Sequence, residues 1–278
     1  MTRNEPREAV SRDELQHLAV FAQTLVDHSR RVILDAVAGG FAVKMKRDGS
    51  FVTSTDVDVE DALRALITDR YPSHGIVGEE QPAVNPAAEY QWILDPIDGT
   101  EDFVQRMPTF GTIVGLHYQG LPVVGIVDHP MLDLRLSASY GGGTWRNGKR
   151  VRVSDFDPTT PDENLRLMLC ARANFIRHSD GGPVFDHLTR RFPNHRIYRS
   201  CYAHACAVSG QVDVMVEYGN RIWDLAAAQL LTEEAGGAYR LVQDQDIPGT
   251  GRVLGAVFGA PEAVTRAFAT LTEPYPIC

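Results

Sequence analysis

Cysteine and positive charge are both scarce in this chain of 278 residues. The four cysteines form no Cys-x-x-Cys pair and no zinc-like spacing, so we expect free thiols in a reducing cytosol, with neither a disulfide framework nor a structural zinc site. Lys and Arg number 27 against 36 Asp and Glu, and the formal net charge is −9. This balance argues against nonspecific binding to nucleic acid or to an anionic membrane surface.

Long apolar runs are also missing. No stretch approaches the roughly 18 apolar residues that a membrane span needs, and residues 1–10 lack the apolar segment of a signal peptide. We therefore expect a soluble cytoplasmic protein. The composition, 44% hydrophobic and 23% charged, is that of a globular protein long enough for one compact unit or two abutting halves. An acidic chain that acts on an anionic substrate needs added positive charge, which suggests metal ions.

The hexapeptide at 95–100, Asp-Pro-Ile-Asp-Gly-Thr, is the most informative segment. It follows the apolar run 92–94, which predicts a buried strand that breaks at Asp95 because Pro96 cannot sit in a regular central strand. A short helical pattern, 101–106, comes next. Two carboxylates at a strand end, facing the amides of a helix start, suit a hard divalent cation and a phosphate group. An Asp-Gly pair alone is common turn chemistry, but the earlier aspartate and the proline favour a site.

Patterning predicts the remaining elements of the first half. They are a long helix from a capping box, Ser11 with Glu14, to Gly-Gly at 39–40; a β-hairpin, 41–45 and 51–53, with an Asp-Gly turn; a helix, 57–70; a strand, 75–78; and an antiparallel meander, 112–118, 123–127 and 134–138.

The second half alternates strands with helices. The predicted strands are 165–170, 196–198, 212–217 and 253–259, and the predicted helices are 183–191, 202–209, 224–235 and 261–271. The Asp- and Pro-rich stretch 155–164 is the best boundary, which gives an α+β half, 1–155, and an α/β half, 156–278. Layered sheets and helices are the expected architecture.

Four acidic residues stand where predicted strands stop: Glu79, Asp95, Asp98 and Asp224. In open α/β sheets, ligands bind at the carboxyl ends of strands, so this placement predicts a shared site. Taken singly, Glu79 also fits a solvated loop acid, and Asp224 fits a plain helix N-cap.

Four motifs together resemble the inositol monophosphatase superfamily. They are Gly-Glu-Glu at 78–80, the segment 92–100, Trp-Asp at 223–224 and Glu-Ala-Gly-Gly at 234–237, and the likeness runs from about 46 to 237. The resemblance implies a Mg²⁺-dependent phosphomonoesterase with an αβαβα layered fold, usually a homodimer.

The resemblance also implies the ligands. Glu79, Asp95 and the backbone carbonyl of Ile97 would hold one Mg²⁺, and Asp95, Asp98 and Asp224 would hold a second; a third metal is left open. Two cations about 4 Å apart can activate a water and neutralise a leaving alkoxide, which the very slow hydrolysis of phosphate monoesters requires.

Catalytic and phosphate-binding roles follow from the same resemblance. Asp56 and Thr100 match positions that orient and deprotonate the attacking water, and Glu79 is counted with them as catalytic. The backbone amides of Gly99 and Thr100 would bind the phosphate.

The substrate is less closely defined. Segments 108–112, 125–130 and 201–203 look more like the histidinol-phosphate phosphatase branch than the inositol branch. This chain has Ser200 where that branch usually has an acid, and Trp223 where it often has Tyr, so inositol phosphate stays open as the substrate. A catalytically silent binding protein on the same fold is the other alternative, and the retained carboxylates at every matched metal-ligand position weigh against it.

The expected substrate contacts are Ser200, Tyr202 and Glu217. Glu217 would face an ammonium or hydroxyl group, although an exposed strand-end acid is an equal alternative. If histidinol phosphate is the substrate, Asp128 or His129 could lie near its imidazole. Because His129 and His204 lack a His partner at metal spacing, we interpret both otherwise as packing or polar-loop residues. Cys201 and Cys206 are expected to be buried small apolar groups.

Overall fold

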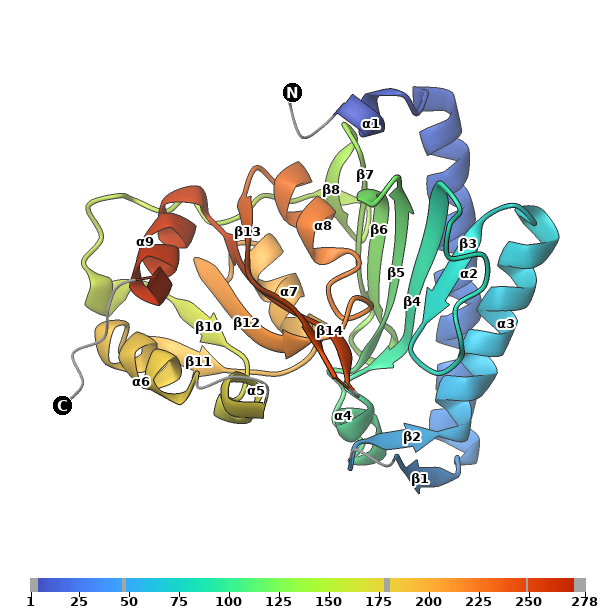
Figure 1. The fold of residues 1–278 in the computed structure, drawn as a ribbon, viewed down its shortest axis with the longest axis horizontal. Helices are drawn as coiled ribbons and strands as arrows, with labels where there is room; N and C mark the ends of the chain where they lie inside the picture. The colour runs from blue at the N-terminus through green and yellow to red at the C-terminus, as the bar shows by residue number, and fades with distance from the viewer. Residues whose placement is uncertain (1–4, 47–48, 178–180, 249, 273–278) are drawn as a thin grey trace.

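Two β-sheets and three helical layers alternate through the protein in the computed structural model, which describes residues 5–46, 49–177, 181–248 and 250–272. Figure 1 shows α2 (Arg12–Gly39) and α3 (Ser54–Arg70) on the outer face of the larger sheet. Helices α7 (Cys201–Val208) and α8 (Ala228–Glu234) lie between the sheets, and α9 (Pro261–Thr272) covers the far face of the smaller one. The expected αβαβα layering is confirmed.

Seven strands of the described residues form the larger sheet, in the order β3-β4-β5-β6-β7-β8-β9. The β3–β4 pair is parallel and all later pairs are antiparallel, so the predicted meander is confirmed. The strands are β3 (Gly75–Gly78), β4 (Tyr90–Asp98), β5 (Gly111–Tyr118), β6 (Leu121–His129), β7 (Leu134–Ser139), β8 (Gly143–Arg146) and β9 (Lys149–Arg150).

Five strands of the described chain form the smaller sheet, in the order β11-β10-β12-β14-β13. They are β10 (Leu167–Leu169), β11 (His195–Ile197), β12 (Val214–Asn220), β13 (Ala238–Ile247) and β14 (Gly251–Gly259). Strand β10 pairs in parallel with β11 and β12, and β14 is antiparallel to its neighbours. The edge strand β13 was not predicted, because its largely exposed or half-exposed residues include a polar run that carries no apolar signal.

The remaining elements are short. They are helices α1 (Glu5–Glu8), α4 (Thr100–Val104), α5 (Arg172–Arg177) and α6 (Gly182–Arg191), 3₁₀ turns at Pro130–Leu132 and Asp162–Asn164, and the hairpin β1 (Val43–Met45) with β2 (Phe51–Thr53). The hairpin is confirmed, and residues 47–48 of its predicted turn lie outside the described residues.

Helix α2 begins where its cap predicted. The Ser11 hydroxyl accepts a hydrogen bond from the Glu14 amide at 3.2 Å, and Gly40, with φ of 95°, ends the helix. The reciprocal half of the capping box is wrong: the Glu14 carboxylate accepts from the Tyr90 hydroxyl at 2.8 Å instead. That bond ties the helix to the first residue of β4.

Strand β4 does not break at Asp95, which corrects the sequence prediction. It continues to Asp98, and the register with β5 shifts between these two aspartates. Pro96 lies in this bulge, where the ladder does not need a backbone N–H, which proline lacks. Its carbonyl accepts a hydrogen bond from Thr112 Oγ1 at 2.8 Å. Asp95 is thereby kept inside the sheet while Asp98 stands at its end.

Asp224 does not begin a helix either. Helix α8 starts at Ala228, and residues 222–227 form consecutive turns. The Asp224 carboxylate accepts from the Arg221 amide at 2.6 Å, which closes a tight turn after β12. The carboxylate is therefore carried by a loop between strand and helix.

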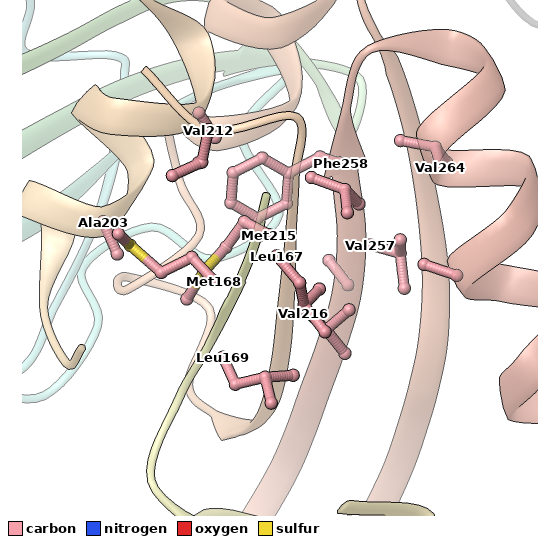
Figure 2. Packing of buried hydrophobic residues seen from close by; sticks show 14 of the residues in the cluster. Leu167, Met168, Leu169, Ala203, Val212, Met215, Val216, Val257, Phe258 and Val264 are labelled. Atoms are coloured by element: carbon pink, nitrogen blue, oxygen red, sulfur yellow. The ribbon is translucent and has the colours of Figure 1, made fainter. Parts of the chain in front are cut away.

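The apolar cores lie between the layers. Figure 2 shows Ala203 of α7 on one side of the smaller sheet and Val264 of α9 on the other, with Met215, Phe258 and Val257 between them. Among the described residues, the helices fall short of the length and apolar character that crossing a membrane requires.

Candidate active site

Three aspartates from distant parts of the chain converge between the two sheets. Asp95, Asp98 and Asp224 each offer a carboxylate oxygen, and these oxygens lie within 4.8 Å of one another. The first two come from the bulged end of β4, and the third comes from the turn after β12. The bulge is what allows both β4 carboxylates to face the same place, since successive strand residues otherwise alternate sides.

Asp95 is the most deeply placed of the three, with 1% of its surface exposed. Its Oδ1 is buried and has no hydrogen-bond partner among the described residues. Burial, followed by repulsion from Glu79 and Asp98, raises the pKa of this carboxyl well above its usual range. A buried, unpaired carboxylate is costly without a cation beside it.

The other two aspartates are held by backbone amides. The Cys201 amide, at the start of α7, donates to Asp98 Oδ2, and the Arg221 amide donates to Asp224. Burial raises the pKa of both carboxyls, with mutual repulsion adding to the effect on Asp224. These amides orient the two side chains and leave carboxylate oxygens for a further ligand.

Glu79 follows β3, whose parallel pairing places Gly78 opposite Leu94 and so brings Glu79 beside Asp95. Its charge contributes to the raised pKa of Asp95 and of Asp224. Lys46 Nζ lies 2.7 Å from an oxygen of Glu79 and 2.7 Å from one of Glu80. The lysine comes from the β1–β2 hairpin, and no sequence spacing links it to these acids.

The turn that carries Glu79 is anchored by Glu60, which sequence reasoning missed. Glu60 is fully buried in α3, and its carboxylate accepts from the Glu80 amide at 2.8 Å, the Gln81 amide at 3.0 Å and Arg64 Nε at 2.8 Å. The buried face of α3 also carries Asp56 and Arg64, and the contacts of Glu60 reach residues far along the chain, so no local pattern marked it.

Asp56 and Thr100 lie together, as the resemblance implies. Thr100 Oγ1 is 3.3 Å from Asp56 Oδ1 and 3.0 Å from the Ile97 carbonyl oxygen. Burial raises the pKa of Asp56 to about 6, although hydrogen bonds from Thr53 act in the opposite direction. Thr53 and Asp56 form a capping box at the start of α3, a short-range pattern that the sequence also contains.

Gly99 joins β4 to α4 with a φ of 80°, which glycine adopts without strain. A Cβ at this position would lie 3.1 Å from the Cβ of Ser200. The close approach packs the end of the hexapeptide against the start of α7, and so links the two halves of the site.

The three predicted substrate contacts have different surroundings. The Ser200 hydroxyl lies 3.5 Å from the Thr109 carbonyl, and the Tyr202 ring contacts those of Tyr198 and His129. Glu217 is buried in β12, so its alternative interpretation as an exposed acid is wrong.

Asp128, His129 and His204 are all buried, and each has its own partners. Asp128 is bound to Arg30 and Arg135, at 2.8 and 2.6 Å, which ties it to α2 and β7. His129 packs against Tyr202 with its Nδ1 near two carbonyls, as a packing residue does. His204 packs as expected, against Phe258, and in addition pairs with Glu217, which the sequence did not indicate.

The cysteines behave as predicted where the structure describes them. Cys170, Cys201 and Cys206 are free and buried, and Cys278 lies outside the described residues.

The donor set fits a hard divalent cation. It consists of three aspartate carboxylates, which are ligands that such ions prefer, and one buried carboxylate oxygen is without a partner among the described residues. A group of negative charges of this kind is stable near neutral pH when a cation offsets it.

Known proteins resemble this chain over most of its length. A sequence model of the inositol monophosphatase family matches residues 14–274. The chloroplastic bifunctional phosphatase IMPL2 of Arabidopsis thaliana is 31% identical over 84% of this chain and 67% of that protein. A histidinol-phosphatase of Chlorobaculum parvum is 30% identical over 69% and 73%, and an inositol monophosphatase of Mesembryanthemum crystallinum is 30% identical over 79% and 84%.

Solved structures agree. An inositol monophosphatase from Anabaena matches with a TM-score of 0.78 and 25% identity, over 95% of this chain and 98% of that one. The suhB protein of Bartonella henselae has a TM-score of 0.79 at 20% identity, over 93% and 100%, a likeness of fold alone.

Proposed function

The chain belongs to the inositol monophosphatase family of metal-dependent phosphomonoesterases, and we propose that it uses Mg²⁺ to hydrolyse a small phosphate ester, with L-histidinol phosphate as the first candidate. One observation carries the metal assignment: Asp95, Asp98 and Asp224 present oxygens within 4.8 Å of one another, with Asp95 buried and unpaired at Oδ1 among the described residues.

We assign two cation sites to these residues. Glu79, Asp95 and the Ile97 carbonyl would hold one ion, and Asp95, Asp98 and Asp224 would hold the other. Bound there, divalent cations would supply an activated water and stabilise the leaving oxygen. The Lys46 ammonium, 2.7 Å from Glu79, would then share this glutamate with the first ion.

Asp56 and Thr100 are proposed to orient the attacking water. Their contact at 3.3 Å supports a relay in which the hydroxyl is held toward the water and the carboxylate receives its proton. A pKa of about 6 for Asp56 suits a base that acts near neutral pH. The amides of Gly99 and Thr100, at the turn into α4, would bind phosphate oxygens.

Replacing Thr100 with Ala should lower kcat by roughly 10- to 100-fold while KM changes little. The hydroxyl is assigned to a water whose charge develops only in the transition state, so ground-state binding does not depend on it. Thr100→Ser keeps the hydroxyl and is the matched control, which should retain most of the rate. A raised KM with unchanged kcat in Thr100→Ala would refute the assignment.

The second half of the chain is proposed to recognise the leaving group through Ser200, Tyr202 and Glu217. Support for L-histidinol phosphate comes from the acid at 217 and from the similarity to a histidinol-phosphatase. Support for inositol phosphate comes from relatives of that name and from the hydrogen bonds that Glu217 already accepts, which suit a neutral hydroxyl.

Glu217→Gln should separate these substrates. A desolvated carboxylate–ammonium contact is worth roughly 2 to 4 kcal/mol, so L-histidinol phosphate should lose on the order of 30-fold or more in kcat/KM. Inositol phosphate should lose much less, since an amide still hydrogen-bonds to hydroxyls. Glu163→Gln, at an exposed position in the same half, is the control. Equal losses on both esters would end the histidinol assignment.

Phosphate release from a panel of esters, with and without Mg²⁺, tests the proposal as a whole. Faster release from L-histidinol phosphate than from the other esters supports the proposal. Faster release from inositol phosphate would keep the phosphatase assignment and replace the proposed substrate. A protein that binds Mg²⁺ and releases phosphate from none would be the catalytically silent alternative.

Three further proposals concern the whole molecule. Residues 1–155 would supply most metal ligands and residues 156–278 would complete the site and contact the leaving group. We also propose a cytoplasmic homodimer, by resemblance to the family. Sedimentation of the purified protein would test the dimer.

A further inference from the structure

Glu217 has a dedicated partner in His204. The imidazole Nε2 of His204 lies 3.1 Å from Glu217 Oε1, and the two side chains are 3% and 5% exposed. Because a carboxylate only accepts hydrogen bonds, the imidazole is the donor. The side-chain amide of Asn220 donates to the other oxygen, Oε2. Both oxygens of Glu217 are therefore held in fixed positions.

The helix that carries His204 also holds the metal cluster. Cys201, one helical turn before His204 in α7, donates its amide to Asp98. The first amide of α7 therefore bonds Asp98, and a side chain one turn later in the same helix bonds Glu217. The charges of His204 and Glu217 both act on the pKa of Asp98, which places the pair close to the carboxylate cluster.

The acidic surroundings of His204 favour its protonated form, and its contact with Glu217 is the nearest of them. Burial on its own lowers the pKa of the imidazole, but the attraction of Glu217, its hydrogen bond and the charges of Asp98 and Asp224 outweigh burial and raise it. The ring packs edge-to-face on Phe258, with centroids 5.2 Å apart, which fixes its plane. The second nitrogen, Nδ1, is buried and has no partner among the described residues.

We infer that His204 is a positioning residue that holds the Glu217 carboxylate and offsets its charge, so that it weakens the preference of the leaving-group subsite for a cation. This inference rests on the proposed function, because it concerns the same subsite. The paired carboxylate would still favour an ammonium-bearing leaving group over a hydroxyl-bearing one, but by less than an unpaired carboxylate would. Without His204, the preference for the ammonium would therefore be stronger.

The test compares kcat/KM for L-histidinol phosphate with kcat/KM for inositol 1-phosphate. His204→Gln keeps a donor near Nε2 but removes the charge, and should raise the histidinol-to-inositol ratio by roughly 5- to 10-fold, mainly through a lower KM for the cationic ester. His204→Phe should raise the ratio as well, but with a higher KM for both esters because the carboxylate is no longer held. His17→Gln, at an exposed position of α2, is the control.

The double variant His204→Gln with Glu217→Gln decides whether the effect passes through Glu217. The double variant should have the same histidinol-to-inositol ratio of kcat/KM as Glu217→Gln alone. A ratio that moves equally in both backgrounds, or one unchanged in His204→Gln, overturns the inference. A protein that hydrolyses neither ester overturns the proposed function instead. In that case the role of the His204–Glu217 pair is tested by calorimetry, as the ratio of the binding constants of the free alcohols L-histidinol and inositol.

Discussion

In excess chelator the protein is expected to release no phosphate from any ester, and added Mg²⁺ or Mn²⁺ should restore release. All proposed ligands are oxygens, which suit these cations. The carboxylates cannot neutralise the developing charge of a phosphoryl transition state themselves, since they carry the same sign. Phosphate release after chelation and after metal addition is the measurement.

Thermal unfolding provides a second reading of the same site. Mg²⁺ should raise the melting temperature, because the proposed ligands Asp95, Asp98 and Asp224 are brought together only in the folded protein. Ca²⁺ is a useful comparison, since it can occupy oxygen ligands while preferring more of them at longer distances. Full turnover in chelator would rule out the metal mechanism.

Asp95→Asn should be the most damaging single substitution. Asp95 is proposed to bind both cations, so its loss should lower kcat/KM by about a thousand-fold or more. Folding should be kept, because the amide has nearly the same shape. In the metal-free protein the substitution should raise the free energy of unfolding by about 1 to 2 kcal/mol, since it removes a buried charge with an unpaired oxygen.

A control variant separates the effect of losing a metal ligand from the effect of losing any one negative charge. Asp58→Asn removes a carboxylate at an exposed position of α3 and should leave both turnover and the response to Mg²⁺ unaltered. Asp95→Asn should lose most of the Mg²⁺-induced rise in melting temperature. A near-normal rate in Asp95→Asn would show that the reaction occurs elsewhere.

The pH dependence of stability follows from the raised pKa of Asp95. An acid whose pKa is higher in the folded state binds its proton more tightly there than in the unfolded chain. Its contribution therefore becomes destabilising as pH rises from the unfolded value, about 4, toward the folded value. The metal-free wild type should lose stability relative to Asp95→Asn across that window, measured by denaturant unfolding at several pH values.

Local sequence signals predicted most elements of the fold. The cap at Ser11, the apolar strand before Asp95 and the meander after it are short-range patterns, and each is found near its predicted bounds. The predictions failed where chain neighbours do not decide conformation. Strand β4 continues past Pro96 because β5 pairs with it on both sides of the bulge, and Asp224 stays in a turn because its carboxylate bonds a nearby amide.

The candidate site divides in the same way. The acidic residues could be found by their position after apolar runs and by the resemblance to a family. Lys46 and Glu60 could not be found in this way. Lys46 contacts Glu79 and Glu80, and Glu60 accepts from the Glu80 amide, and both sets of contacts join residues far apart in sequence. The pairing of His204 with Glu217 requires α7 to pack on β12, and a lone histidine in an apolar helix gives no sign of it.

The sequence by itself determined which residues could bind a cation and which segments would form most of the strands and helices. These properties depend on side-chain chemistry and on periodicity over a few residues. Only the tertiary structure decided which carboxylates meet, which are held by amides, and which, like Asp95 Oδ1, are left without a partner among the described residues. The physical reason is that such contacts join elements separated by long stretches of chain, and their geometry is determined when the layers pack.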